Sequence, residues 1–520
     1  MQSKTRRRFL SDVGQGMLVA GVGYGTALDL GLTAAWAEED AADELQFGPR
    51  EPLVGLMQDT PADKLLPVLI KKLKQGTDLR ELVAAGALAN ARTFGGEDYV
   101  GFHTMMALAP AYHMAKELPA AQQALPVLKV LYRNSDRIQA FGGRKAEVLH
   151  TVKPGTLSSG TPDGRVLLQQ VRKKEVDAAE ATFAEMSQGS IEDAFNELLV
   201  AVQDKSEVHR IVMPYRAWEL IGFVGKKHAH TMLRQSVRYC VKNESAKYDD
   251  YSKGGRDLLP KLLEEHKLLF KPLGKRLVDD AWIERMSRTI FGSSPEQAAE
   301  AAAAALAEGI APDAVGEAMS LASTQLVLRD VGRTEKQASP GKPAGSIHGA
   351  GIGVHACDSA NAWRNIAKVS NTRNTIASLI LGSHQVAFDR TSRGGEFLKW
   401  EPYPLADHRE KIKATTPEGI LKEAEAAIQA GDQGTATAAI ARYAELDCPH
   451  RPVIDLLLRY GVSEDGALHA EKYYRTVTEE FASTRPAFRW EHLKALARVT
   501  ASEHGWPAPG CDQARDLLRA

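Results

Sequence analysis

Four glycines divide the chain at nearly equal intervals, and each separates two stretches in which apolar residues recur at three- and four-residue spacing. They are Gly76, Gly189, Gly309 and Gly431, and the intervals between them are 113, 120 and 122 residues. Glycine closes helices because it adopts the left-handed backbone conformation without strain, so each position predicts the joint of a helical hairpin. The near-constant interval predicts four related helical units.

The segments around these joints are rich in Ala, Leu, Glu and Lys, which favour helices. Strand-like alternation is scarce, and its best candidate is the stretch 148–171, within which Val152-Lys-Pro-Gly and Pro162-Asp-Gly mark turns. Residues 329–346 and 388–416 are predicted to be irregular connectors. Apolar periodicity predicts helices over 62–73, 175–186, 295–307 and 417–430.

These patterns predict an all-α fold of helical hairpin pseudo-repeats packed around a central histidine-lined site. We expect one large domain over residues 38–520. Its four pseudo-repeats are predicted near 62–142, 175–245, 295–390 and 417–505.

The first 37 residues have the pattern of a twin-arginine signal peptide. Arg6-Arg7-Arg8 precedes a short, glycine-rich apolar stretch, and Ala35-Trp36-Ala37 has the small-x-small form of a cleavage site. We therefore expect export to the periplasm by the twin-arginine machinery, with a mature chain that begins near Glu38. The apolar stretch is too short and too rich in glycine for a stable membrane span, and none is expected in the mature protein.

The charge balance argues against some classes of partner. The chain has 65 Lys and Arg against 66 Asp and Glu, whereas nucleic acids and anionic membranes both reward a basic surface. No hydrolase elbow, phosphate loop or dinucleotide fingerprint is present in the sequence. Four widely spaced cysteines, Cys240, Cys357, Cys448 and Cys511, would allow one or two disulfides in an oxidising compartment, and their spacing does not choose among the pairings.

A histidine follows each glycine joint on a predicted helix: His103, His209, His355 and His469. Neutral imidazole is the commonest nitrogen ligand for iron, zinc, copper and nickel. If four equivalent helices converge, these side chains can meet at one metal ion. The alternative for any single histidine is an ordinary core or surface residue.

Two further residues are candidates for the same site. His384 follows an apolar run on a predicted helix over 372–388 and is expected to point inward. Lys472 lies three residues after His469, on the same helix face. If Lys472 is buried beside a metal, its amine pKa falls, and a neutral amine can take up carbon dioxide to form a carbamate ligand.

The segments that begin at Phe102-His103, His209, His355 and His469 resemble the histidine segments of the questin oxidase family, which includes oxygenases that open anthraquinone rings. The resemblance implies a helical protein with non-haem iron held by four histidines and a carboxylated lysine. Carried over residue by residue, it implies His103, His209 and His355 as ligands, His469 or His384 as the fourth histidine, and Lys472 as the carbamate. Phe102 and Tyr215 stand where the family pattern has further histidines.

We accordingly expect an exported, metal-dependent oxidoreductase. The leading hypothesis is a non-haem Fe(II) oxygenase acting on an aromatic or quinone-like small molecule. Two alternatives from other classes remain open: a non-catalytic helical scaffold or binding protein with structural histidines, and a periplasmic haem or metal carrier.

Overall fold

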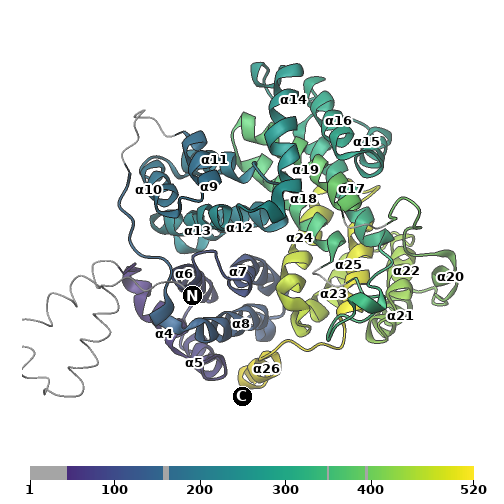
Figure 1. Ribbon diagram of the computed structural model, residues 1–520. Coiled ribbons are helices and arrows are strands. Elements are labelled where there is room, and N and C mark those ends of the chain that lie inside the picture. Colours follow the sequence, from purple (N-terminus) through teal and green to yellow (C-terminus); the bar gives the residue numbers. More distant parts are fainter. Residues whose placement is uncertain (1–43, 156–162, 348–350, 393–395, 520) are drawn as a thin grey trace, which may run out of the picture.

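The computed structural model describes residues 44–155, 163–347, 351–392 and 396–519 of the chain. The predicted signal peptide, residues 1–37, lies outside them. In this described part the protein is all-α, with 23 α-helices, α4 to α26, and no β-strand (Figure 1). The predicted fold class is therefore confirmed. A relation of the helices by a fourfold repeat stays a prediction.

The helices follow one another in four sequential groups. The first holds α4 (Glu51–Asp59), α5 (Ala62–Lys74), α6 (Leu79–Phe94), α7 (Tyr99–Glu117) and α8 (Leu125–Phe141). The second holds α9 (Gly164–Lys173), α10 (Val176–Met186), α11 (Ile191–Val202), α12 (Val208–Val224) and α13 (Ala229–Lys242). The third holds α14 (Leu259–Glu265), α15 (Asp280–Gly292), α16 (Pro295–Ala307), α17 (Pro312–Arg329), α18 (Ile352–Val369) and α19 (Thr372–Ser392). The last holds α20 (Ala406–Glu410), α21 (Pro417–Gln429), α22 (Gln433–Ala444), α23 (Arg451–Ser463), α24 (His469–Ser483), α25 (Trp490–Glu503) and α26 (Cys511–Arg519).

All four predicted glycine joints separate two consecutive helices. Gly76, Gly309 and Gly431 have φ of 95°, 82° and 68°, the left-handed conformation that closes a helix. Gly189 joins α10 to α11 but is not among the residues with positive φ. The prediction of a left-handed conformation is therefore wrong for Gly189, although the predicted position of this joint between two helices is correct.

The stretch predicted as the best strand candidate contains a helix instead. α9 covers Gly164–Lys173, and Asp163 caps it by accepting a hydrogen bond from the backbone of Arg165. Leu167 and Val171 are both buried, four residues apart, which is the spacing of one helix face. The alternation between residues 148 and 171 was thus a misleading signal. The long connector after α17 is irregular as predicted, apart from one short 3₁₀ turn at Glu335–Gln337.

Four helices that are far apart in the sequence pack around the middle of the molecule (Figure 1). α7 packs against α12 and α24, and α18 packs against the same two helices, so the four form a closed ring. Most of α7 is buried, as is nearly all of α18. A helix that is apolar around most of its circumference belongs in a core, and this explains why both lie at the centre.

All four cysteines lie in the described part of the chain and are unpaired. None of the described helices combines the length and the apolar character needed to cross a bilayer.

Candidate functional site

The four histidines that follow the glycine joints meet at the centre of this helix ring. His103 projects from α7, His209 from α12 and His355 from α18, while His469 begins α24. Adjacent ring centroids lie 4.9 Å apart for His103–His209, 5.6 Å for His209–His355, 5.2 Å for His355–His469 and 5.1 Å for His469–His103. The imidazoles therefore form a closed quartet, which we call the histidine quartet.

The outer nitrogens of three of these rings have partners two to four residues earlier in the chain. His103 Nδ1 lies 2.7 Å from the carbonyl of Tyr99, and His469 Nδ1 lies 3.1 Å from the carbonyl of Ala467. His209 Nδ1 lies 2.7 Å from a carboxylate oxygen of Glu207. Because a carbonyl or carboxylate only accepts, each Nδ1 carries the proton, and each Nε2 of a neutral ring keeps its lone pair.

Two of the inner nitrogens lie close together. His355 Nε2 and His469 Nε2 are 3.1 Å apart. The Nε2 atoms of His103 and His209 are buried and have no hydrogen-bond partner. Buried nitrogens are usually paired, so these two unpaired atoms require an explanation.

Burial favours the neutral form of His103. The pKa of His103 is held well below its usual range of about 6.5, first by burial and then by the nearby Lys472 ammonium and the other rings. A neutral ring with a free Nε2 is the form of histidine that binds metal ions.

Lys472 lies beside the quartet and is itself buried, with 3% of its surface exposed. Burial lowers its pKa to about 8, and the charges of Asp358 and Glu471 oppose this only in part. In the described structure no carboxylate comes within ion-pair distance of its ammonium. Glu471 pairs instead with Lys129 at 2.7 Å, and Asp358 accepts a hydrogen bond from Thr476 at 2.8 Å. The amine is therefore close to becoming neutral at physiological pH.

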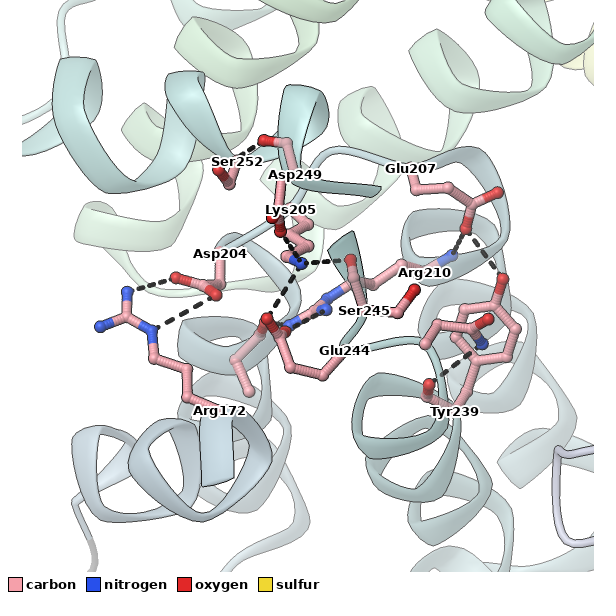
Figure 2. Close-up of polar contacts among 12 residues, drawn as sticks. Arg172, Asp204, Lys205, Glu207, Arg210, Tyr239, Glu244, Ser245, Asp249 and Ser252 are labelled. Atoms are coloured by element: carbon pink, nitrogen blue, oxygen red, sulfur yellow. Dashed lines mark hydrogen bonds and ion pairs between the residues drawn. The ribbon is translucent and has the colours of Figure 1, made fainter. Parts of the chain in front are cut away.

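Glu207 orients His209 from the N-terminus of α12. Its carboxylate also accepts hydrogen bonds from the hydroxyl of Tyr239 at 2.8 Å and from the backbone of His209 and Arg210, and Figure 2 shows it facing Tyr239. Burial alone would raise the pKa of Glu207, but the His209 ring and these hydrogen bonds lower it to about 2. The sequence patterns above do not predict a role for this residue. Its only signal was an acidic residue at the N-cap, two positions before the histidine.

Phe102 forms an apolar surface beneath two of the rings. Its centroid lies 4.9 Å from that of His103, in a stacked arrangement, and 5.1 Å from that of His209. The position where the family pattern has a further histidine thus holds an aromatic side chain that packs on the quartet.

His384, the remaining predicted ligand, lies elsewhere. It projects from α19, stacks on Phe388 with 6.2 Å between centroids, and packs against Gly254. Burial lowers its pKa to about 4. Among the described aromatic contacts, none joins it to the quartet.

The quartet is not a formed metal site as its side chains stand. Among the described residues, no group of three or more His, Cys, Asp or Glu side chains is arranged so that it could hold a metal ion. Binding would require the rings to turn about their side-chain bonds.

Comparison of the chain with protein-family models, with curated proteins and with solved structures finds no match.

Proposed function

We propose that this chain is a metal-dependent oxidoreductase whose ion is held by His103, His209, His355 and His469. The observation that carries the proposal is the meeting of these four imidazole rings, from four separate elements, at one buried centre. Four core histidines without a shared role would have no reason to collect at one point.

The spacing of the rings supports the proposal. Two imidazoles bound to one ion at about 2.1 Å each have nitrogens roughly 3 to 3.5 Å apart and ring centroids roughly 5 Å apart. The His355–His469 nitrogen distance of 3.1 Å and the four centroid distances of 4.9 to 5.6 Å fall near these values. Only a modest turn of the rings is then needed to place all four Nε2 atoms on one ion.

The partners of the outer nitrogens also support it. Histidines that bind metals nearly always donate their second N–H to a carbonyl or a carboxylate, which fixes the ring and raises its basicity. Tyr99, Glu207 and Ala467 provide such acceptors for three of the four rings.

Lys472 would complete the site as a carbamate. Its neutral amine adds to carbon dioxide, forming an N–C bond and releasing one proton, and the product is an anion. With its pKa lowered to about 8, a useful fraction of the amine is neutral near pH 7.5. The carbamate would add an oxygen ligand to the four imidazoles. Its single negative charge would offset part of the positive charge of a divalent cation.

We propose iron as the metal and dioxygen as the co-substrate, because the histidine segments resemble those of the questin oxidases. When bound, Fe(II) would supply the electrons for dioxygen activation. The substrate we propose is an aromatic or quinone-like small molecule. The twin-arginine pattern of residues 1–37 supports export in the folded state, which suits a cofactor inserted before transport.

One observation favours a second candidate, an exported scaffold with structural histidines. A distance of 3.1 Å between His355 Nε2 and His469 Nε2 also suits an N–H···N hydrogen bond between the two rings. In that case the quartet would be a polar core cluster without a metal.

Metal analysis of protein purified from a strain with intact export separates these functions. The proposal expects about one equivalent of iron per chain, lost in His103→Ala and His355→Ala, together with dioxygen uptake in the presence of an aromatic substrate. Metal-free protein whose melting temperature does not respond to added Fe(II) would support the scaffold and overturn the proposal. A strong haem absorption band would overturn it in favour of a carrier.

A further inference from the structure

A pocket of about 370 Å³ opens from the surface onto the histidine quartet. Both His209 and His355 are part of its lining, so a molecule in the pocket would contact the quartet directly. The volume lies at the lower end of the range of about 300 to 1,000 Å³ that is usual for small-molecule sites. It suits a molecule of one or two rings.

Aromatic side chains form much of the pocket wall. Tyr99, Tyr248 and Tyr251 line it, together with the aliphatic Val208 and Ile352. Tyr251 packs edge-on against Phe388 with 5.0 Å between centroids, and Tyr99 lies 4.4 Å from the ring of His103. Such walls favour a flat aromatic ligand, because stacked and edge-to-face contacts add to the burial of apolar area.

The tyrosine-bearing wall is held in place by a buried lysine. Lys205 is 1% exposed, and its ammonium contacts the carbonyl of Ser245 at 3.2 Å, Asp249 at 2.9 Å and Glu244 at 2.9 Å (Figure 2). The backbone N–H of Ser206 donates to the carbonyl of Tyr251 at 3.0 Å. These contacts tie the 3₁₀ segment Ala246–Ser252 to the start of α12, so the wall is preorganised.

The lining holds two carboxylates that already have partners, Glu207 and Asp389, and one cation that can pair with an anionic group on the ligand. Lys247 is the one Lys or Arg among the described lining residues, and its ammonium lies 5.3 Å from the ring centroid of Tyr248. Glu207 already accepts hydrogen bonds from Tyr239, His209 and the backbone, and Asp389 is buried and has a partner of its own. Lys247 is thus the cation that can turn toward a ligand at the mouth of the pocket.

We infer that this pocket binds a one- or two-ring aromatic carboxylate. The ring would lie among Tyr99, Tyr248 and Tyr251, the carboxylate would pair with Lys247, and the opposite edge would face His209 and His355. That the bound carboxylate is a substrate rests on the proposed function. Its binding to the pocket does not require a metal.

The test is equilibrium dialysis, which measures the affinity of 3-hydroxy-2-naphthoate for the metal-free and the Fe(II)-loaded protein. We expect saturable binding at one site, weakened about two- to fivefold in Lys247→Gln and largely restored in Lys247→Arg, since an exposed charge pair changes affinity only a few-fold. The uncharged methyl ester should bind wild-type protein and Lys247→Gln equally. Lys336→Gln, which removes an exposed lysine from the connector after α17, is the matched control and should bind like wild type.

Equal affinity of the naphthoate for wild type and Lys247→Gln would overturn the inference, as would an ester that binds as tightly as the acid. Tyr251→Leu gives a second check, because loss of one wall should weaken the acid and the ester alike. The proposed function fails separately, through absence of retained iron, and that outcome leaves the dialysis result of the metal-free protein unchanged.

Discussion

At the scale of single residues, the site depends on side chains that contact the histidines from outside. Glu207 is the clearest case, since one buried carboxylate accepts hydrogen bonds from the ring of His209, the hydroxyl of Tyr239 and the first turn of α12. It links the fold of the helix to the orientation of the imidazole. Its replacement should therefore weaken metal binding as well as the start of the helix.

We predict that Glu207→Gln lowers metal affinity about 10- to 100-fold, the usual effect of removing a partner of a ligating histidine. The amide keeps the shape of the side chain but loses the charge that favours a proton on His209 Nδ1. Competition with a chelator, read by metal analysis, measures the change. Tyr239→Phe, which leaves the carboxylate in place, should lose less metal affinity. Equal metal affinities of wild type and Glu207→Gln would contradict this role of Glu207.

A second residue-scale prediction concerns pH. His492 is fully buried between the hydroxyls of Thr324 and Thr484, at 3.0 Å and 3.1 Å. Burial lowers its pKa to about 4; Glu480 opposes the shift and Arg364 adds to it. Because the unfolded chain binds a proton here at higher pH than the folded one, stability is fully present above the unfolded pKa of about 6.5 and falls as pH drops toward 4.

The free energy of unfolding should therefore fall between pH 7 and pH 5 by about 2 kcal/mol more in wild type than in His492→Gln. Urea titrations at the two pH values measure this difference. Parallel losses in the two proteins would show that His492 does not bind fewer protons in the folded state.

At the scale of elements, two kinds of joint connect the helices. Gly76 has φ of 95° and nothing within 4 Å of an added Cβ, so only the backbone conformation opposes alanine. Gly189 lies outside the positive-φ region, and an added Cβ would meet only the carbonyl of Met186 at 3.6 Å. The two positions look alike in sequence but differ in conformation.

Gly76→Ala should destabilise the protein by about 1 to 2 kcal/mol, the cost of the left-handed conformation for an L-residue. Gly189→Ala should be neutral or stabilise by up to about 1 kcal/mol, because it restricts the unfolded chain without strain in the folded one. Chemical denaturation measures the free energy of unfolding of both variants and of the wild type. Equal destabilisation would mean that both joints need glycine.

The start of α24 is held by a buried ion pair. Lys129 of α8 contacts Glu471 at 2.7 Å and donates to the carbonyls of Gly461 at 2.9 Å and Glu464 at 2.5 Å. Just before His469, Ala467 and Leu468 have φ of 48° and 66°, an unusual conformation for residues other than glycine. Strain of this kind persists only where surrounding contacts enforce it, and Lys129 supplies such contacts.

Lys129→Met should cost roughly 3 to 5 kcal/mol, because it leaves the carboxylate of Glu471 buried without a counter-charge. Adding Glu471→Leu should recover part of the loss. Urea unfolding of the wild type, the single variants and the double variant measures the free energies of unfolding for this double-mutant cycle. A double variant that is less stable than Lys129→Met alone would contradict the pairing.

At the scale of the whole molecule, periodicity and glycine positions were enough to predict the helices over 62–73 and 295–307, because local spacing encodes a helix face. The repeated histidine also predicted which imidazoles meet. The stretch 148–171 failed because an alternating pattern and a short amphipathic helix share the same apolar positions at Leu167 and Val171.

Other features of the fold and the site could not be predicted from short stretches of the sequence. The pairing of Lys129 with Glu471 joins residues more than 300 positions apart, and the pocket beside His209 arises from five separate segments. The placement of His384 depends on how α19 packs, because an inward-facing apolar run does not say which part of the core it faces. Such contacts follow from tertiary packing alone.

The most direct test of the quartet is metal titration of the purified chain with each of its four histidines changed to alanine in turn. We predict one Fe(II) site per wild-type chain, with affinity lost in His103→Ala, His209→Ala, His355→Ala and His469→Ala and retained in the buried control His384→Asn. If His384→Asn abolishes binding while a quartet variant retains it, or if wild-type protein binds no metal, the quartet is not the metal centre.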